Sequence, residues 1–276
     1  MEERIKSKLI FLDVDGTLTP PGGYVPPESA QRAVKRAREL GHKVFLCSGR
    51  NYGMIKPLMK FGFDGGIASC GGYVYADDKV LYDCPMNEAQ KSRLITLLKE
   101  NGASVSIESR NQSFNDDIAL KYLKQERGSH LYSMIKAVWV ELGARPAEEY
   151  NGDPVYKLVI ACDGRECLEP AIQALGDELN FIIHDFSEKD CVFAEVISRE
   201  FNKGTGIRII TEALGYDMVD TIGFGDSSLD VDMIDVVDIG VCMANGSAYL
   251  KEQSDLICPS LEEDGIEWAF RKLGLI

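Results

Sequence analysis

Carboxylates, a hydroxyl and an ammonium group occur in this chain at points where short apolar segments end. Asp13 and Asp15 follow the first apolar run, Ser48 follows the second, and Asp226 follows a later one. Lys203 begins a helical pattern that follows the apolar run Cys191–Ile197. In an open parallel sheet, ligands bind beyond the carboxyl ends of the strands. We therefore expect these five side chains to meet at one edge of a sheet.

The chemistry that such a cluster supports is metal-assisted phosphoryl transfer. Crowded carboxylates repel one another unless a hard cation neutralises them, and oxygen ligands with a bound phosphate suit Mg²⁺. Asp13 is then the expected nucleophile, forming an aspartyl-phosphate, while Lys203 and the metal screen the phosphoryl group. Asp15 is expected to protonate the leaving alcohol and later to activate water. Gly16 lets the chain turn and present backbone N–H groups to phosphate oxygens.

Composition narrows the class of protein. The chain has 276 residues, 45% of them hydrophobic, which is enough for a sizeable core in one or two domains. Its net charge of −14 disfavours nucleic acids and anionic membranes as partners. Apolar runs fall short of the ~20 residues that cross a bilayer, and the N-terminal residues lack a signal-peptide core, so we expect a cytoplasmic protein. The 8 scattered cysteines favour reduced, buried thiols over disulfides or zinc ligands.

An alternation of strands and helices is expected to position the reactive groups. This alternation covers residues 1–84 and 189–276 and predicts a parallel sheet with helices on both faces. The expected strands are residues 8–13, 43–47, 66–69, 219–224, 238–242 and 255–258, with a hairpin at 73–76 and 79–82. The expected helices are residues 28–40, 52–61, 203–214, 231–236, 247–253 and 265–273.

The segment 85–188 departs from this strict alternation of strands and helices, which predicts a separate α+β insert. Its expected helices are residues 88–100 and 166–178, and its expected strands are 103–109, 155–161 and 180–184. A mostly helical pattern covers residues 116–145. The predicted fold class is therefore α/β, with a Rossmann-like parallel-sheet core interrupted by an α+β domain.

Four ordered motifs resemble those of the haloacid dehalogenase superfamily. They are Asp13-Val14-Asp15-Gly16-Thr17-Leu18, Ser48-Gly49-Arg50, Lys203-Gly204 and Gly225-Asp226-Ser227-Ser228-Leu229-Asp230. The insert falls between the second and third motifs. That placement, together with Met243-Ala244-Asn245-Gly246, resembles the Cof-type sugar-phosphate phosphatases, so the insert is expected to be a large α/β cap that sets substrate specificity.

The resemblance implies a role for each motif residue. Asp13 would be the nucleophile and Asp15 the general acid/base, with Ser48 and Lys203 completing the catalytic set. The residues expected to bind the phosphoryl group are Ser48, Gly49 and Lys203. The residues expected to hold Mg²⁺ are Asp13, the backbone carbonyl of Asp15 and Asp226, supported by Asp230. The implied substrate is a small phosphorylated metabolite, such as a sugar phosphate.

Two positions depart from the family pattern and keep other functions open. Leu229 stands where relatives usually carry Asn, and Cys70 precedes Gly71 where relatives commonly have Asn-Gly. One alternative is a phosphosugar mutase that uses the same aspartyl-phosphate. The other is a weakly catalytic protein that binds or senses a phosphorylated ligand. The substrate's identity and the oligomeric state are left open.

Overall fold

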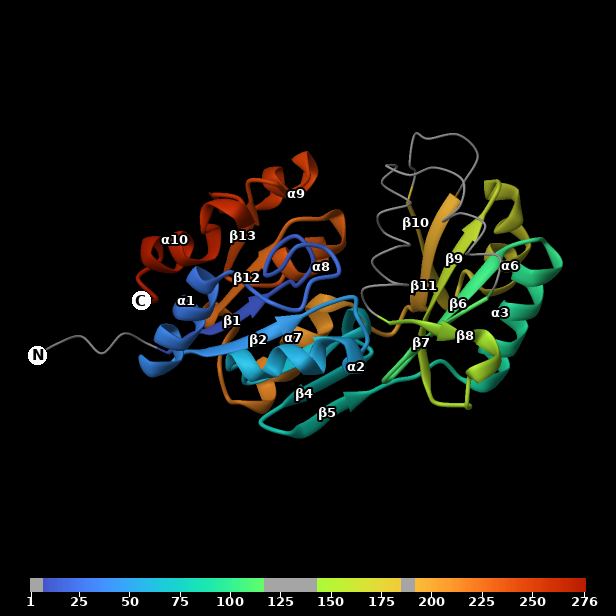
Figure 1. The fold of residues 1–276 in the computed structure, drawn as a ribbon, viewed down its shortest axis with the longest axis horizontal. Helices are drawn as coiled ribbons and strands as arrows, with labels where there is room; N and C mark the ends of the chain where they lie inside the picture. The colour runs from blue at the N-terminus through green and yellow to red at the C-terminus, as the bar shows by residue number, and fades with distance from the viewer. Residues whose placement is uncertain (1–6, 117–142, 185–191) are drawn as a thin grey trace, which may run out of the picture. The chain divides into compact units, whose positions relative to one another are not determined.

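The computed structural model describes residues 7–116, 143–184 and 192–276, and the chain divides into two compact units, each with its own sheet (Figure 1). Unit 1 comprises Met1–Arg50, Ile55–Asp83 and Phe201–Ile276. Unit 2 comprises Asn51–Met54 and Cys84–Glu200. Among the described residues, no helix is long and apolar enough to span a membrane.

The sheet of unit 1 has the strand order β14-β13-β12-β1-β2-β3-β4-β5. The strands from β14 to β3 run parallel, whereas β4 and β5 form an antiparallel hairpin at the edge. The strands are β1 Leu9–Leu12, β2 Lys43–Cys47, β3 Gly65–Ala68, β4 Tyr73–Ala76, β5 Lys79–Asp83, β12 Thr221–Gly225, β13 Ile239–Met243 and β14 Leu256–Cys258. The predicted parallel-sheet core and its hairpin are thus confirmed.

Helices cover both faces of this sheet, which explains why its central strands are apolar throughout. All of β1 is buried, and successive side chains point to opposite faces. On one face, Phe11 stacks on Phe45 with ring centroids 5.4 Å apart, in a core that includes Ile207. On the other, Phe224 packs against Phe270. The helices are α1 Glu28–Glu39, α7 Lys203–Ala213, α8 Val231–Ile234, α9 Ala248–Gln253 and α10 Gly265–Lys272.

Prolines help to set the bounds of two of the predicted helices that are shorter than expected. The predicted helix 52–61 is wrong as a single α-helix, because it forms α2 Tyr52–Ile55 and then the 3₁₀ helix Lys56–Phe61. Pro57 has no N–H to donate to the preceding turn, so the α-helical ladder stops. The predicted helix 166–178 narrows to α6 Glu169–Leu175, with Pro170 in its first turn, where the missing N–H costs nothing.

Unit 2 has a sheet of order β10-β11-β9-β6-β7-β8. Its strands are β6 Ser104–Ser109, β7 Ser113–Asn115, β8 Arg145–Pro146, β9 Val155–Cys162, β10 Leu179–His184 and β11 Val192–Ser198. Helix α3, Glu88–Glu100, is capped by Asn87 and packs with α6 on a core that includes Leu158. Most of the predicted helical stretch 116–145 lies outside the described residues, as does the predicted domain boundary after residue 188. The described strand β11, which the predicted core segment 189–276 included, belongs to the sheet of unit 2.

Candidate active site

Two neighbouring parallel strands carry Asp13 and Asp226 to the same edge of the unit 1 sheet. β1 pairs with β12 in register, and the N–H of Asp13 donates to the carbonyl of Phe224 at 2.9 Å, continuing that pairing by one residue. Asp226 directly follows β12. The adjacency of these strands therefore places side chains that are far apart in sequence at one carboxyl edge.

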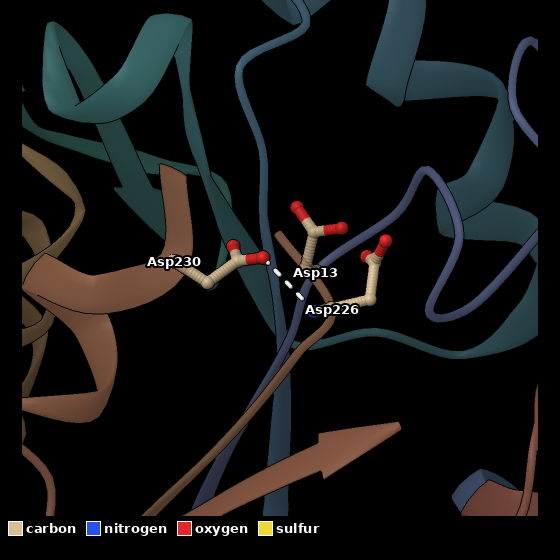
Figure 2. A group of neighbouring side chains, drawn as sticks. All are labelled: Asp13, Asp226 and Asp230. Atoms are coloured by element: carbon tan, nitrogen blue, oxygen red, sulfur yellow. Dashed lines mark hydrogen bonds between the residues drawn. The ribbon is translucent and has the colours of Figure 1, made fainter. Parts of the chain in front are cut away.

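Asp13, Asp226 and Asp230 form a carboxylate cluster in which one oxygen of each lies within 4.8 Å of the others (Figure 2). The Oδ2 of Asp230 accepts hydrogen bonds from the backbone N–H groups of Asp226 at 3.0 Å and Ser227 at 2.9 Å. Asp230 thereby fixes the turn that presents Asp226. Two members of the cluster, Asp13 and Asp230, are buried.

Lys203 supplies a positive charge to this cluster. Its Nζ donates to Asp13 Oδ1 at 2.7 Å and to Asp230 Oδ1 at 2.5 Å, and its side chain is only 4% exposed. Lys203 is the first residue of α7, whose start is fixed by a capping box between Asn202 and Thr205. A lysine is disfavoured at a helix N-terminus by the helix dipole, and the two carboxylates offset that cost.

The charges at this site do not balance. Burial, followed by the negative charge of Asp230, raises the pKa of Asp13 well above its ordinary value. Burial and the same neighbour raise the pKa of Asp226 to about 6. Although burial favours the neutral amine, the carboxylates of Asp13 and Asp230 outweigh it and raise the pKa of Lys203. One ammonium group thus faces three crowded carboxylates, an arrangement that a further cation would relieve.

The donor set fits a hard divalent cation such as Mg²⁺. Only oxygen ligands converge, as that ion prefers. Asp230 has both oxygens committed to Lys203 and to backbone N–H groups, so Asp13 and Asp226 are the available side-chain ligands. Thr17 Oγ1 donates to Asp226 Oδ1 at 2.9 Å. A Cβ on Gly16 would lie 2.5 Å from Asp226 Oδ2, so only glycine lets the loop approach this carboxylate so closely.

Ser48 lies at the end of β2, beside the strand that carries Asp13. Its N–H donates to the carbonyl of Ile67 at 2.8 Å, and its Oγ accepts from the N–H of Arg50 at 3.1 Å. Ser48 is 1% exposed, and Gly49 follows it in the same turn. These bonds, with one from the N–H of Cys70 to the carbonyl of Ser48, hold Ser48 between β2 and the turn that follows β3.

Asp15 lies outside the carboxylate cluster and is paired with Arg50. The guanidinium donates through Nε to Asp15 Oδ2 at 2.7 Å and through Nη2 to Asp15 Oδ1 at 2.6 Å. Arg50 also donates to the carbonyl of Gly23 at 2.9 Å. The sequence placed Arg50 in the second motif but indicated no partner for it; its position directly after Ser48-Gly49 was the available signal.

The turn at Cys70 brings strained backbone close to the site. Ser69 and Cys70 are non-glycine residues with φ of 49° and 59°, and Gly71 follows with φ of 115°. The N–H of Cys70 donates to the carbonyl of Ser48 at 3.0 Å. Backbone strain of this kind is concentrated at functional sites. Cys70, one of the two positions expected to depart from the family pattern, thus lies beside Ser48.

Asn245 is a second residue whose role sequence reasoning missed. Its Nδ2 donates to the carbonyl of Gly16 at 2.8 Å, and its Oδ1 accepts from the N–H of Leu261 at 3.3 Å. Asn245 therefore ties the loop after Asp13 to the C-terminal part of unit 1. The motif 243–246 was a signal for its importance but not for these contacts.

Residues 10–270 match the model of a family described as haloacid dehalogenase-like hydrolase. YkrA of Bacillus subtilis (strain 168), which is named as a phosphatase, is 30% identical over 271 residues, covering 98% of this chain and 99% of its own. A crystal structure of a Geobacillus kaustophilus HTA426 protein has a TM-score of 0.80 at 26% identity, covering 98% of this chain and 100% of that one. The subclass IIB sugar phosphatase BT4131 shares the fold, with a TM-score of 0.77 at 22% identity over 98% of this chain and 100% of its own.

Proposed function

This chain belongs to the haloacid dehalogenase-like hydrolases, and from that premise we propose that it is a Mg²⁺-dependent phosphatase acting through an aspartyl-phosphate on Asp13. The observation that carries the proposal is the environment of the Asp13 carboxylate. It is buried at a strand end, bonded to Lys203 at 2.7 Å and within 4.8 Å of Asp226 and Asp230. The substrates are small phosphate monoesters.

Each residue has a task in the proposed reaction. A bound divalent cation supplies positive charge that reduces repulsion between the phosphate and the carboxylates. Lys203 occupies Oδ1 of Asp13, which leaves Oδ2 as the attacking atom. Asp15 gives its proton to the leaving oxygen as the ester bond breaks. Asp15 then takes a proton from water, which attacks phosphorus and releases inorganic phosphate and free Asp13. Ser48 and Gly49 are proposed to bind the phosphoryl oxygens.

We further propose that unit 2 is the cap that selects the substrate. It is inserted between the turn of Ser48 and the helix of Lys203, and the fold is shared with a sugar phosphatase. A buried ion pair joins Lys157 to Glu195 at 3.2 Å on neighbouring strands of its sheet. Paired charges on a sheet face suit recognition of a polar, hydroxylated group, which supports a sugar phosphate or a similar metabolite.

Release of inorganic phosphate from a panel of sugar and cofactor phosphates, with and without Mg²⁺, tests this function. We expect metal-dependent turnover that falls on the order of 10³-fold or more in Asp13→Asn. Asp77→Asn is the control, because Asp77 lies in the exposed hairpin turn and asparagine tolerates its positive φ. Full activity in Asp13→Asn would exclude the mechanism, and an isomeric phosphate without free phosphate would indicate a mutase instead.

A further inference from the structure

The ion pair between Arg50 and Asp15 is unusual in how its two partners are exposed. The side chain of Arg50 is 3% exposed, whereas that of Asp15 is 37% exposed. The guanidinium also donates through Nη1 to the carbonyl of Gly23 at 2.9 Å. Its Cζ lies over the ring of Tyr24, 5.3 Å from the ring centroid. A guanidinium so buried loses hydration and conformational freedom, so its fork presents fixed donors to Asp15. The arginine is therefore the rigid partner and the aspartate the accessible one.

Donors from Arg50 and Gly22 occupy most of the acceptor sites of the Asp15 carboxylate. A carboxylate offers about four acceptor sites, two on each oxygen. Oδ1 accepts from Arg50 Nη2 at 2.6 Å and from the N–H of Gly22 at 2.7 Å. Oδ2 accepts from Arg50 Nε at 2.7 Å. Counting the bonds of the described residues, the second site on Oδ2 is the one that remains.

We propose that Arg50 is a positioning residue whose fork orients the carboxyl group of Asp15 and leaves Oδ2 as the oxygen that works in the reaction. The inference rests on the proposed phosphatase function. As Asp13 Oδ2 bonds to phosphorus and the ester bond breaks, the proton moves from Asp15 Oδ2 to the leaving oxygen, releasing the alcohol. Water later returns a proton to the same atom, while its oxygen bonds to phosphorus and the bond from Asp13 to phosphorus breaks. Arg50 stays charged throughout and acts only through Asp15.

A second ion pair in unit 1 shows what a purely structural arginine fork looks like here. Arg38 donates through Nε and Nη2 to the two oxygens of Asp64, each at 3.0 Å. Asp64 also accepts from the N–H of Val44 at 2.9 Å, so this pair ties α1 to the sheet. It has the same fork geometry as the Arg50 pair but involves no candidate site residue. Arg38 therefore provides a matched control.

Single-turnover kinetics on two classes of phosphate ester test the proposal. An alkyl phosphate needs a proton on its leaving oxygen, whereas p-nitrophenyl phosphate releases a stable anion and needs none. In Arg50→Met we expect release of the alkyl alcohol to slow about 100-fold or more, and release of p-nitrophenolate in the first turnover to change by less than about 5-fold. Arg50→Lys, which keeps the charge and loses the fork, should show the same selective loss at about one-tenth the size.

Arg38→Met should slow both esters equally or not at all. An Arg50 variant that slows both first-turnover rates by the same factor, or neither, overturns the proposal, because a structural role does not depend on the leaving group. If Arg50→Met fails to fold in thermal unfolding, Arg50→Lys decides the question by the same comparison. Wild-type protein and Asp13→Asn are run in parallel: loss of the p-nitrophenolate burst in Asp13→Asn upholds the proposed function independently of Arg50.

Discussion

At the level of single residues, the least usual feature is a set of carboxylates that the chain's own lysine does not neutralise. Asp226 has its pKa raised to about 6 in the metal-free protein, first by burial and then by the charge of Asp230. A carboxyl whose folded pKa lies above its ordinary value stabilises the fold at low pH. That stability is lost as the pH rises from the ordinary value of 3.8 through about 6.

The raised pKa of Asp226 predicts how the free energy of unfolding changes with pH. Without metal, the protein should lose on the order of 1–3 kcal/mol of unfolding free energy between pH 4 and 7 through Asp226. Mg²⁺ replaces the proton, so it should raise the melting temperature more at pH 7 than at pH 5. Thermal unfolding with and without Mg²⁺ at both values measures this. Asp226→Asn should abolish the difference; an equal effect of Mg²⁺ in that variant contradicts the assignment.

At the level of elements, the position of Lys203 depends on a contact between a turn and a helix start. A Cβ added to Gly71 would lie 2.2 Å from the carbonyl oxygen of Asn202, the residue that caps α7. Gly71 also has φ of 115°, where side chains are strained. The absence of a side chain at Gly71 therefore lets the turn after β3 lie against Asn202, the residue that precedes Lys203.

We predict that Gly71→Ala destabilises the fold more than backbone strain alone explains. Gly274→Ala is the matched control, since Gly274 has φ of 70° and open space around its Cβ position. The control should cost about 1–2 kcal/mol, and Gly71→Ala about 1–3 kcal/mol more, with reduced turnover because Lys203 moves. Urea unfolding compares the two free energies. Equal losses would show that the contact with Asn202 relaxes without cost.

Elements with a clear repeat could be predicted from the chain alone. The strands Lys43–Cys47 and Tyr73–Ala76 have the predicted bounds, because apolar runs between turn residues are locally unambiguous. The helix through Pro57 was wrong, although the proline itself was visible. The family and the enzyme class were confirmed, since ordered motifs identify both. The roles of the individual site residues stay predictions.

The site was harder to predict than the elements because its contacts are long-range. Asp13, Asp226 and Lys203 do gather at one edge, as strand ends predict, and their pairing depends on β1 lying next to β12. Asp15 was expected to act beside Asp13, but its carboxylate is paired with Arg50, 35 residues away. No periodicity or spacing in either segment encodes that contact, which arises when two loops fold over the sheet edge.

At the level of the whole molecule, each unit has its own hydrophobic core and so the means to unfold separately. The core on one face of the unit 1 sheet includes Ile207, and that of unit 2 includes Leu158, both fully buried. The side chains proposed to hold the metal, Asp13 and Asp226, both belong to unit 1. A ligand stabilises the structure that it binds, by about 2.7 kcal/mol at a hundred times its dissociation constant.

We therefore predict that Mg²⁺ protects unit 1 selectively against hydrogen–deuterium exchange. Amides of β1 and β12 should exchange up to ~100-fold more slowly with saturating Mg²⁺, whereas those of β9 should not change. Leu158→Ala, which should cost unit 2 about 2–5 kcal/mol, serves as the comparison, since it should speed exchange in β9 and leave the Mg²⁺ effect in unit 1 intact. Uniform protection of both units by Mg²⁺ would instead mean that they unfold as one cooperative body. In that case the residues proposed to hold the metal would determine the stability of unit 2 as well, and variants of Asp13 or Asp226 would speed exchange in β9.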